Sequence, residues 1–269
     1  MDLPEIETLD LRLDGWRLHV TLNRPEVRNA MSARMVRELH ATLEAISGDE
    51  SVRAVILRGA GGHFCAGGDI KDMAMARQAE PGPDGRDPVE ALNRSFGTLL
   101  QVIEGLPQPV IAVCEGSVMG GGFGLACVAD VTIAVHGTRF RLPETSLGIT
   151  PAQIAPFIVR RIGLTHARRL GVTGASLEAD EAVRLGIAHL VTDDAGRALR
   201  DVLTQIGRCA PRAVAATKQL MLRVGQDPLP VLLDNAAADF AIRARSDEAA
   251  AGIAAFLSKQ PAPWASEDS

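Results

Sequence analysis

The chain has 269 residues and a mass of 28.5 kDa, which is long enough to bury a substantial core without metals or disulfides. Apolar residues make up 46% and charged residues 23%, as in an ordinary soluble globular protein. The net charge of −5 at pH 7 and the pI of about 5.7 argue against a general nucleic-acid binder, which would carry a basic surplus. We therefore expect no nucleic-acid partner.

The sequence also gives no sign of disulfides, a metal or a membrane. The four cysteines form no CxxC pair and the six histidines show no pairing at metal-ligand spacing, so we expect free thiols and no metal site. The acidic N-terminus has no apolar run. The uncharged stretch of 14 residues between Glu115 and Asp130 is too short to span a bilayer. These features predict a cytoplasmic protein with no membrane partner.

The first half of the chain alternates predicted strands and helices. Asp14-Gly15 between two alternating segments is a hairpin signal. Ser32 is placed to cap a helix whose apolar residues recur on one face. In chain order the predicted elements are a hairpin over 8–22, a helix over 33–47, a strand over 52–57, a glycine-rich loop over 59–69, a mobile loop over 77–88, a helix over 89–105, a strand over 109–114, a second glycine-rich loop over 116–122, a helix over 121–129 and a strand over 130–135.

The second half is predicted to be mostly helical. The helices expected after residue 150 span 152–161, 165–172, 179–185, 196–208, 211–224, 229–244 and 247–258. The N-terminal part resembles a core of repeated strand–strand–helix units. The C-terminal helices resemble a cap or an oligomerisation element.

The two glycine-rich loops each follow a buried strand. They fit neither GxGxxG nor a P-loop, and Gly116-Ser117 does not begin the GxSxG elbow of a serine hydrolase. Glycines let backbone approach a ligand, and a helix N-terminus presents unpaired N–H groups. Two such N–H groups aimed at one carbonyl oxygen form an oxyanion hole. The alternative is that the glycines serve only tight packing.

Six segments, together with Lys218, carry a resemblance to a known family. They are LNRPEVRNAM (22–31), HFCAGGDIKDM (63–73), PVIAVCEGSVMGGGFGLACVADV (109–131), FRLPETSLGITP (140–151), VTGASLEADEAVRLGIAHLV (172–191) and IAAFLSKQPAPW (253–264). The chain resembles the enoyl-CoA hydratase/isomerase, or crotonase, family over nearly its whole length.

The resemblance implies an α/β fold, a spiral of repeated ββα units over 1–195 that holds an acyl-CoA site. It implies a helical trimerisation region over 196–269, and hence self-association as a homotrimer or a dimer of trimers. The expected partner is an acyl-CoA thioester, and no separate cofactor is expected because coenzyme A is part of the substrate. The oxyanion hole would be the backbone N–H groups of Gly68 and Gly121, which stabilise a thioester enolate.

The sequence departs from the family pattern at one catalytic position. Many hydratases of the family carry two glutamates that hold one water between them. The second matches Glu144, the expected general acid/base, whereas Gly124 stands in place of the first. The segment over 148–157 resembles the branch that hydrates methyl- or isohexenyl-glutaconyl-CoA. We expect Gly124 to leave room for a branched acyl group, and Gly124→Glu to favour short unbranched chains.

The resemblance also implies a set of substrate-binding residues. They are Arg28, Ala66, Asp69, Ile70, Gly124, Thr150, Gln153, Phe256 and Lys259. Arg28 is placed to contact coenzyme A phosphates, or is a plain surface arginine. Asp69 is expected to brace the first loop, and Thr150 either faces the acyl pocket or caps the helix over 152–161. Phe256 and Lys259 lie where the family's last helix reaches the coenzyme A of a neighbouring subunit.

Three functions remain open at this point. The leading one is a lyase that adds water across a 2-enoyl-CoA, with a branched glutaconyl-type substrate. The second is a Δ3-Δ2 enoyl-CoA isomerase that uses Glu144 as its single base. The third, from another class, is a non-catalytic coenzyme A- or RNA-binding member of the family. The acidic charge and the presence of Glu144 argue against the third.

Overall fold

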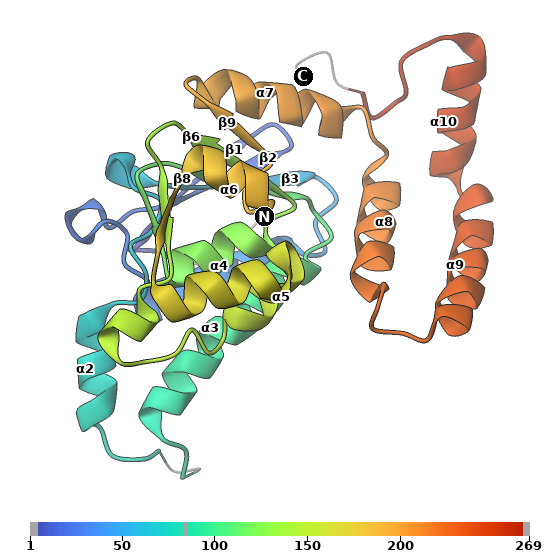
Figure 1. The fold of residues 1–269 in the computed structure, drawn as a ribbon. Helices are drawn as coiled ribbons and strands as arrows, with labels where there is room; N and C mark the ends of the chain where they lie inside the picture. The colour runs from blue at the N-terminus through green and yellow to red at the C-terminus, as the bar shows by residue number, and fades with distance from the viewer. Residues whose placement is uncertain (1–4, 83–84, 266–269) are drawn as a thin grey trace.

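A computed structural model describes residues 5–82 and 85–265 of the chain (Figure 1). Its main sheet has six strands in the order β1-β2-β3-β4-β6-β9. These strands are β1 (Leu9–Asp14), β2 (Arg17–Leu22), β3 (Ala54–Gly59), β4 (Val110–Cys114), β6 (Val131–Val135) and β9 (Leu190–Thr192). Strands β1 and β2 are antiparallel, and the other neighbours are parallel. The predicted hairpin and the three predicted buried strands after it are therefore confirmed.

A smaller sheet of three strands lies beside the main one, in the order β5-β7-β8. The strands are β5 (Ser117–Met119), β7 (Arg139–Arg141) and β8 (Ser176–Glu178). Strand β5 forms inside the predicted second glycine loop, because its backbone pairs in parallel with β7. Short strands of this kind carry too few residues to show an alternating pattern in the sequence.

The helices surround these sheets (Figure 1). They are α1 (Ala33–Ile46), α2 (Ile70–Gln78), α3 (Pro88–Gly105), α4 (Gly121–Val128), α5 (Ala155–Thr173), α6 (Ala179–Leu185), α7 (Ala195–Gly207), α8 (Pro211–Arg223), α9 (Leu229–Ala244) and α10 (Asp247–Ser258). Within the described ranges, none of them has both the length and the apolar character that a bilayer crossing requires.

Most of the predicted helices are confirmed, with one merger. The Ser32 Oγ atom accepts a hydrogen bond from the Met35 N–H at 3.2 Å, and Ser32 therefore caps α1 as predicted. The helices expected over 152–161 and 165–172 form the single element α5. It is interrupted at Gly163, whose φ of +74° and ψ of 159° are not helical. Because glycine tolerates a positive φ, the chain bends at Gly163 and then continues as a helix.

Helix α2 is an element that the sequence reading missed. It occupies residues 70–76, for which no element was predicted, and the first two residues of the predicted mobile loop. It exposes most of its surface, so it has no apolar stripe to detect. Of the predicted mobile loop over 77–88, the first two residues belong to α2 and the last belongs to α3. Residues 83–84 lie outside the described residues, and the mobility of the loop stays a prediction.

The main sheet separates two apolar clusters. Because side chains alternate along a strand, Val55 and Leu57 of β3 face the larger core, whereas Ala54 and Ile56 face the other side. Helix α7 covers that other side, and helices α3, α4 and α5 lie opposite it (Figure 1). The predicted boundary between the core and the C-terminal helical region, after residue 195, stays a prediction. Helix α7, which lies on the C-terminal side of this boundary, packs on the main sheet.

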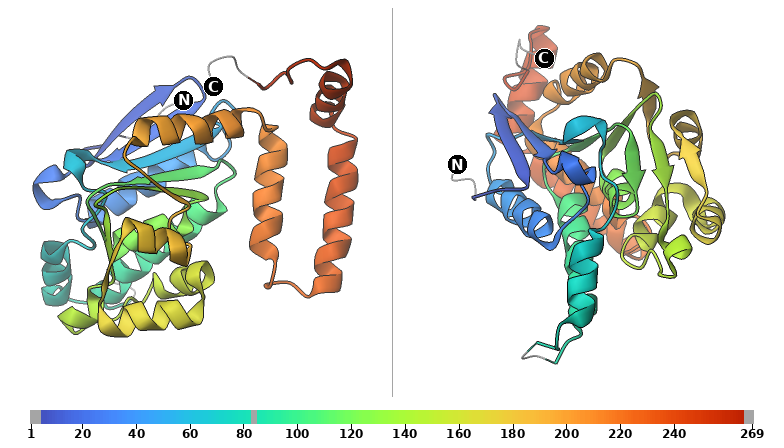
Figure 2. Two further views of the ribbon diagram at one scale, coloured as in Figure 1. Left: turned by 45° about the horizontal axis from the view of Figure 1, so that its top comes forward. Right: turned by 90° about the vertical axis from the view of Figure 1, so that its left-hand side faces the viewer.

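Helices α8, α9 and α10, here called the C-terminal arm (residues 211–258), stand beside the core (Figures 1 and 2). Partly buried polar contacts help to hold the arm: Lys218 Nζ lies 2.7 Å from Asp130 Oδ2 and donates to the Gln108 carbonyl at 3.3 Å. Many large apolar side chains of the arm and its turns are exposed. They are Met221, Val224, Leu229, Val231, Leu233, Phe240, Ile242, Ile253, Phe256 and Leu257.

We predict that the Lys218–Asp130 pair carries a measurable part of the arm's stability. Lys218→Met keeps the length of the side chain but leaves the half-buried Asp130 carboxylate without its cation. The free energy of unfolding should fall by about 1–3 kcal/mol, the range for a lost hydrogen bond to a charged group. Urea unfolding provides the measurement. Arg243→Met, which breaks an exposed pair with Asp239, is the control and should cost under about 1 kcal/mol. Equal losses would contradict the prediction.

Candidate active site

The two glycine-rich loops are joined to each other by backbone hydrogen bonds. The Cys65 N–H donates to the Ser117 carbonyl at 2.9 Å, and the Met119 N–H donates to the Cys65 carbonyl at 2.9 Å. This bridge seats the first loop against β5. As a result, Gly68 of the first loop and Gly121 of the second line one cavity.

The backbone N–H groups of Gly68 and Gly121 are both unengaged. Gly121 is the first residue of α4, and N–H groups in a first helical turn have no acceptor within the helix. The Gly68 N–H donates to no acceptor in the described part of the chain. Gly120, with φ of +49° and ψ of −114°, makes the sharp turn that points α4 at the cavity. The N-terminal end of the helix dipole favours negative charge at this point.

The Glu144 carboxyl group lies against the second loop. Glu144 begins the 3₁₀ turn η3 (Glu144–Leu147) after β7, and its Oε1 lies 2.8 Å from the point where a Cβ on Gly120 would sit. Only a glycine at 120 permits this approach. The Glu144 Oε2 atom is buried and has no hydrogen-bond partner. Burial raises the pKa of Glu144, and a hydrogen bond from its own backbone lowers the pKa only in part. A raised pKa suits a proton-transfer group.

The cavity beside Glu144 has a volume of about 220 Å³. Eight of the predicted site residues line it: Ala66, Gly68, Asp69, Ile70, Gly121, Glu144, Thr150 and Gln153. Their roles in binding or catalysis stay predictions. Four others do not line it: Arg28, Gly124, Phe256 and Lys259. In the described residues, no group of three His, Cys, Asp or Glu side chains is arranged to hold a metal ion.

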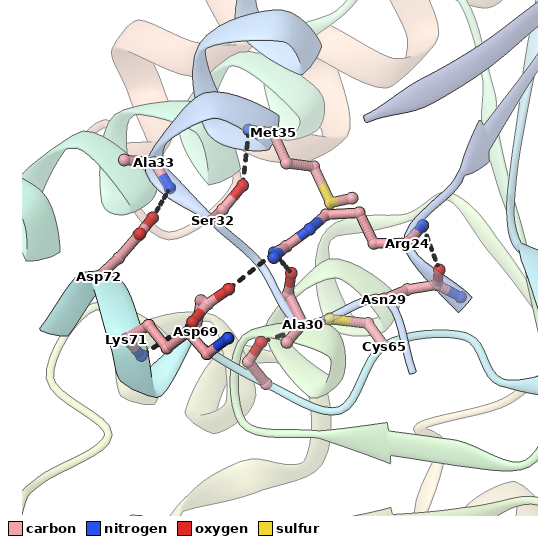
Figure 3. Close-up of polar contacts among 11 residues, drawn as sticks. Arg24, Asn29, Ala30, Ser32, Ala33, Met35, Cys65, Asp69, Lys71 and Asp72 are labelled. Atoms are coloured by element: carbon pink, nitrogen blue, oxygen red, sulfur yellow. Dashed lines mark hydrogen bonds and ion pairs between the residues drawn. The ribbon is translucent and has the colours of Figure 1, made fainter. Parts of the chain in front are cut away.

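Asp69 is tied to the framework of the first loop rather than free in the cavity (Figure 3). Its carboxylate accepts from Arg24 Nη1 at 2.8 Å and from the Lys71 backbone N–H at 2.8 Å, which caps α2. Burial alone would raise the pKa of Asp69, but these hydrogen bonds and the Arg24 charge outweigh it and lower the pKa. These contacts are those of a group that braces the loop.

The predicted space beside Gly124 is absent, because another side chain fills it. A Cβ on Gly124 would lie 2.5 Å from Ile154 Cγ2 and 3.5 Å from Leu100 Cδ1. The expectation that Gly124 makes room for a branched acyl group is therefore wrong. Ile154 is buried and lines the cavity, and it stands as an apolar wall over Gly124. Gly124→Glu cannot be accommodated without displacing Ile154.

The remaining predicted residues lie at the rim or in the arm. The Arg28 side chain is exposed, and its carbonyl accepts the Ala66 N–H at 2.9 Å, so Arg28 sits next to the cavity residue Ala66. Thr150 does not cap the following helix, because α5 begins after Ile154 with no side-chain cap. Phe256, 82% exposed, lies in the arm, and its proposed contact with a neighbouring subunit stays a prediction.

Sequence reasoning missed residues that the tertiary structure brings to the site. Phe96 of α3 lies over the second loop, with its Cζ 3.1 Å from the position of a Cβ on Gly121. Asn29, fully buried, donates to the Ala60 and His63 carbonyls and holds the first loop in place. Asn29 and Arg24 belong to the matched segment LNRPEVRNAM, which was the available signal. Phe96 had no such signal, because it is one of several apolar residues on its helix.

Comparison with known proteins places the chain near acyl-CoA enzymes. The family model described as enoyl-CoA hydratase/isomerase matches residues 18–267. A crystal structure of an enoyl-CoA hydratase/isomerase from Marinobacter aquaeolei is 51% identical, with a TM-score of 0.94 over 97% of this chain and 100% of that one. Pseudomonas aeruginosa AtuE is 52% identical, with a TM-score of 0.92 over the same shares. A 2,3-dehydroadipyl-CoA hydratase of Escherichia coli is 30% identical over 90% of this chain and 92% of its own.

We predict that Gly124 and Ile154 are energetically coupled. Gly124→Ala pushes a Cβ against Ile154 and should lower the free energy of unfolding by about 1–3 kcal/mol, as overpacking does in a filled core. In an Ile154→Ala background, where the obstructing Cγ2 is gone, the same change should cost less. Urea unfolding of the four proteins completes the double-mutant cycle. An identical cost in both backgrounds would show that Ile154 does not fill this space.

Proposed function

The chain belongs to the enoyl-CoA hydratase/isomerase family and is a hydratase-type lyase, and on this premise we propose that its substrate is a branched glutaconyl-type 2-enoyl-CoA thioester. One observation carries the site assignment. Glu144, whose buried Oε2 has no hydrogen-bond partner, lines the same cavity as Gly68 and Gly121, whose backbone N–H groups are unengaged in the described part of the chain. A base and two oxyanion donors that converge on one space support addition to a conjugated thioester.

In the proposed reaction, the thioester oxygen accepts hydrogen bonds from the Gly68 and Gly121 N–H groups. Glu144 takes a proton from water as the water oxygen bonds to the β-carbon, and the electron pair of the double bond moves onto the thioester oxygen as an enolate. The same carboxyl group then returns a proton to the α-carbon and gives the 3-hydroxyacyl product. Each oxyanion donor is typically worth about 10²–10³ in rate, because negative charge develops only in the transition state.

The proposed substrate class follows from the single carboxylate. Ile154 closes the space over Gly124, so Glu144 has no second protein carboxylate there to help hold a water. A glutaconyl-type substrate brings its own carboxylate, which orders the water or anchors the chain. The segment over 148–157 supports this class. The name of the Escherichia coli relative also supports it, because the acyl group of 2,3-dehydroadipyl-CoA carries a second carboxylate.

The isomerase remains the second candidate, and one observation favours it. An isomerase needs a single base that moves a proton between two carbons, and Glu144 is a single base with an unpartnered oxygen. Such a reaction needs no ordered water. The two activities differ in product, so an assay separates them.

We also propose that the protein forms a trimer or a dimer of trimers through the C-terminal arm. The arm leaves a series of large apolar side chains exposed, including Phe240 at 74% and Phe256 at 82%. Exposed apolar surface on this scale is typical of a subunit contact. In this assembly Phe256 and Lys259 reach the coenzyme A of a neighbouring subunit. Light scattering at micromolar concentration should give the mass of three or six chains, and a monomeric mass would contradict the proposal.

We predict that Glu144→Gln lowers turnover by about 10²–10⁴, the usual contribution of general acid–base catalysis, with little change in thioester binding. In the parent, kcat/KM should fall toward low pH with an apparent pKa above that of an exposed glutamate. The carboxyl group must be ionised to act as a base, and burial raises its pKa. Glu178→Gln, at an exposed site on β8, is the control and should keep the parent profile. A Glu144→Gln enzyme within a few-fold of the parent would mean that another group moves the proton.

The substrate proposal is tested with a panel of acyl-CoA thioesters, followed by the absorbance of the conjugated thioester. We expect branched glutaconyl-CoA thioesters to be hydrated at least tenfold better than crotonyl-CoA by kcat/KM, which corresponds to about 1.4 kcal/mol of transition-state binding. A better rate with crotonyl-CoA would contradict the substrate class. A gain of absorbance with a 3-enoyl-CoA would instead indicate the isomerase, and inactivity with every thioester would favour a non-catalytic binding role.

A further inference from the structure

A second carboxylate on the substrate would find no cation inside the active-site cavity. In the described part of the chain, the ionisable groups that line this cavity are all acids: Asp69, Asp72 and Glu144. Asp69 is paired with Arg24, and Asp72 accepts the Ala33 N–H. An anionic acyl end therefore has to be held at the border of the cavity, where another group supplies positive charge.

One wall of the cavity is shared with a basic groove between α3, α8 and the segment before α5. Ala152 and Gln153 line both the cavity and this α3–α8 groove. The Gln153 carboxamide rests directly on Gly97, where any side chain would displace it. Arg94 Nη1 lies 3.1 Å from the same point above Gly97, so the carboxamide and the guanidinium are neighbours. The Gln153 carboxamide and the Arg94 guanidinium therefore form a polar patch at the wall that the cavity and the groove share.

Arg94 differs from the other arginines of this groove in its partners. Arg160 is paired with Glu104, and Arg223 is paired with Asp227. Arg94 donates at 3.0 Å to Thr98 Oγ1 and at 3.0 Å to Gln101 Oε1, which are both neutral. Within the described ranges, Arg94 therefore forms no ion pair with a carboxylate that would balance its charge.

We infer that Gln153 and Arg94 bind the second carboxylate of the substrate, an inference that rests on the proposed glutaconyl-type function. With Gln153 Oε1 against Gly97, the Nε2 group is left to donate to a carboxylate at the end of the cavity. The Arg94 guanidinium supplies the charge for a charge-assisted hydrogen bond. A neutral acyl chain of the same shape gains nothing from this pair, so the site selects for acids.

The test compares a branched glutaconyl-CoA with its distal methyl ester, which has nearly the same shape but no charge. The parent is expected to prefer the acid by kcat/KM. Arg94→Gln should reduce the acid-to-ester ratio about tenfold, mainly through KM for the acid. Arg160→Gln, in the same groove but paired with Glu104 in the parent, is the matched control and should leave the ratio unchanged.

The outcomes separate this inference from the proposed function. A parent that prefers the acid while Arg94→Gln keeps the full ratio would overturn the role of Arg94 and leave the proposed function standing. A parent that hydrates the ester and crotonyl-CoA but not the acid would overturn both. An equal loss with acid and ester in Arg94→Gln would also overturn the inference, because it would indicate a structural effect. A fall in the ratio confined to Arg94→Gln supports it.

Discussion

The site depends on the backbone pairing of two glycine-rich loops that come from different parts of the sequence. Cys65 exchanges hydrogen bonds with Ser117 and Met119, and the two loops approach until Gly67 and Gly120 are in contact. The approach relies on glycine at both positions, because Gly67 (φ +103°) and Gly120 (φ +49°) adopt backbone angles that other residues rarely reach, and a Cβ on Gly120 would also meet Glu144 Oε1 at 2.8 Å. Two unengaged N–H groups are thereby fixed in one cavity before any ligand arrives, which is the preorganisation that electrostatic catalysis requires.

The same close packing explains the state of Glu144. The carboxyl group is pressed against Gly120 and loses water without gaining a partner for Oε2. Its folded-state pKa is raised, so folding favours the neutral form. The resulting stability is present at low pH and is lost as the pH rises through the folded-state pKa. Once ionised, the Glu144 carboxylate therefore costs stability relative to its neutral form.

The acyl side of the cavity is shaped by a different contact, that of Ile154 with Gly124. A missing side chain on α4 lets α5 begin close to it, and Ile154 fills what the sequence suggested was an opening. The wall is apolar there and polar at Gln153, one residue earlier. Two adjacent residues just before α5 thus give the cavity an apolar wall at Ile154 and a polar wall at Gln153.

The sequence alone determined the order of most elements and the family, and it predicted three residues, Gly68, Gly121 and Glu144, that line one cavity. Hairpin, capping and periodicity signals depend on neighbouring residues, so they could be detected at Asp14-Gly15, at Ser32 and along the long helices. The matched motifs identified Gly68, Gly121 and Glu144 because those residues sit in contiguous segments. Only the tertiary structure decided which residues meet across the chain: β5 with β7, Phe96 over Gly121, Arg24 with Asp69, and Ile154 in the space over Gly124. Contacts between distant residues leave no periodic pattern in the sequence, and a glycine in a motif does not reveal which side chain will fill the space it leaves.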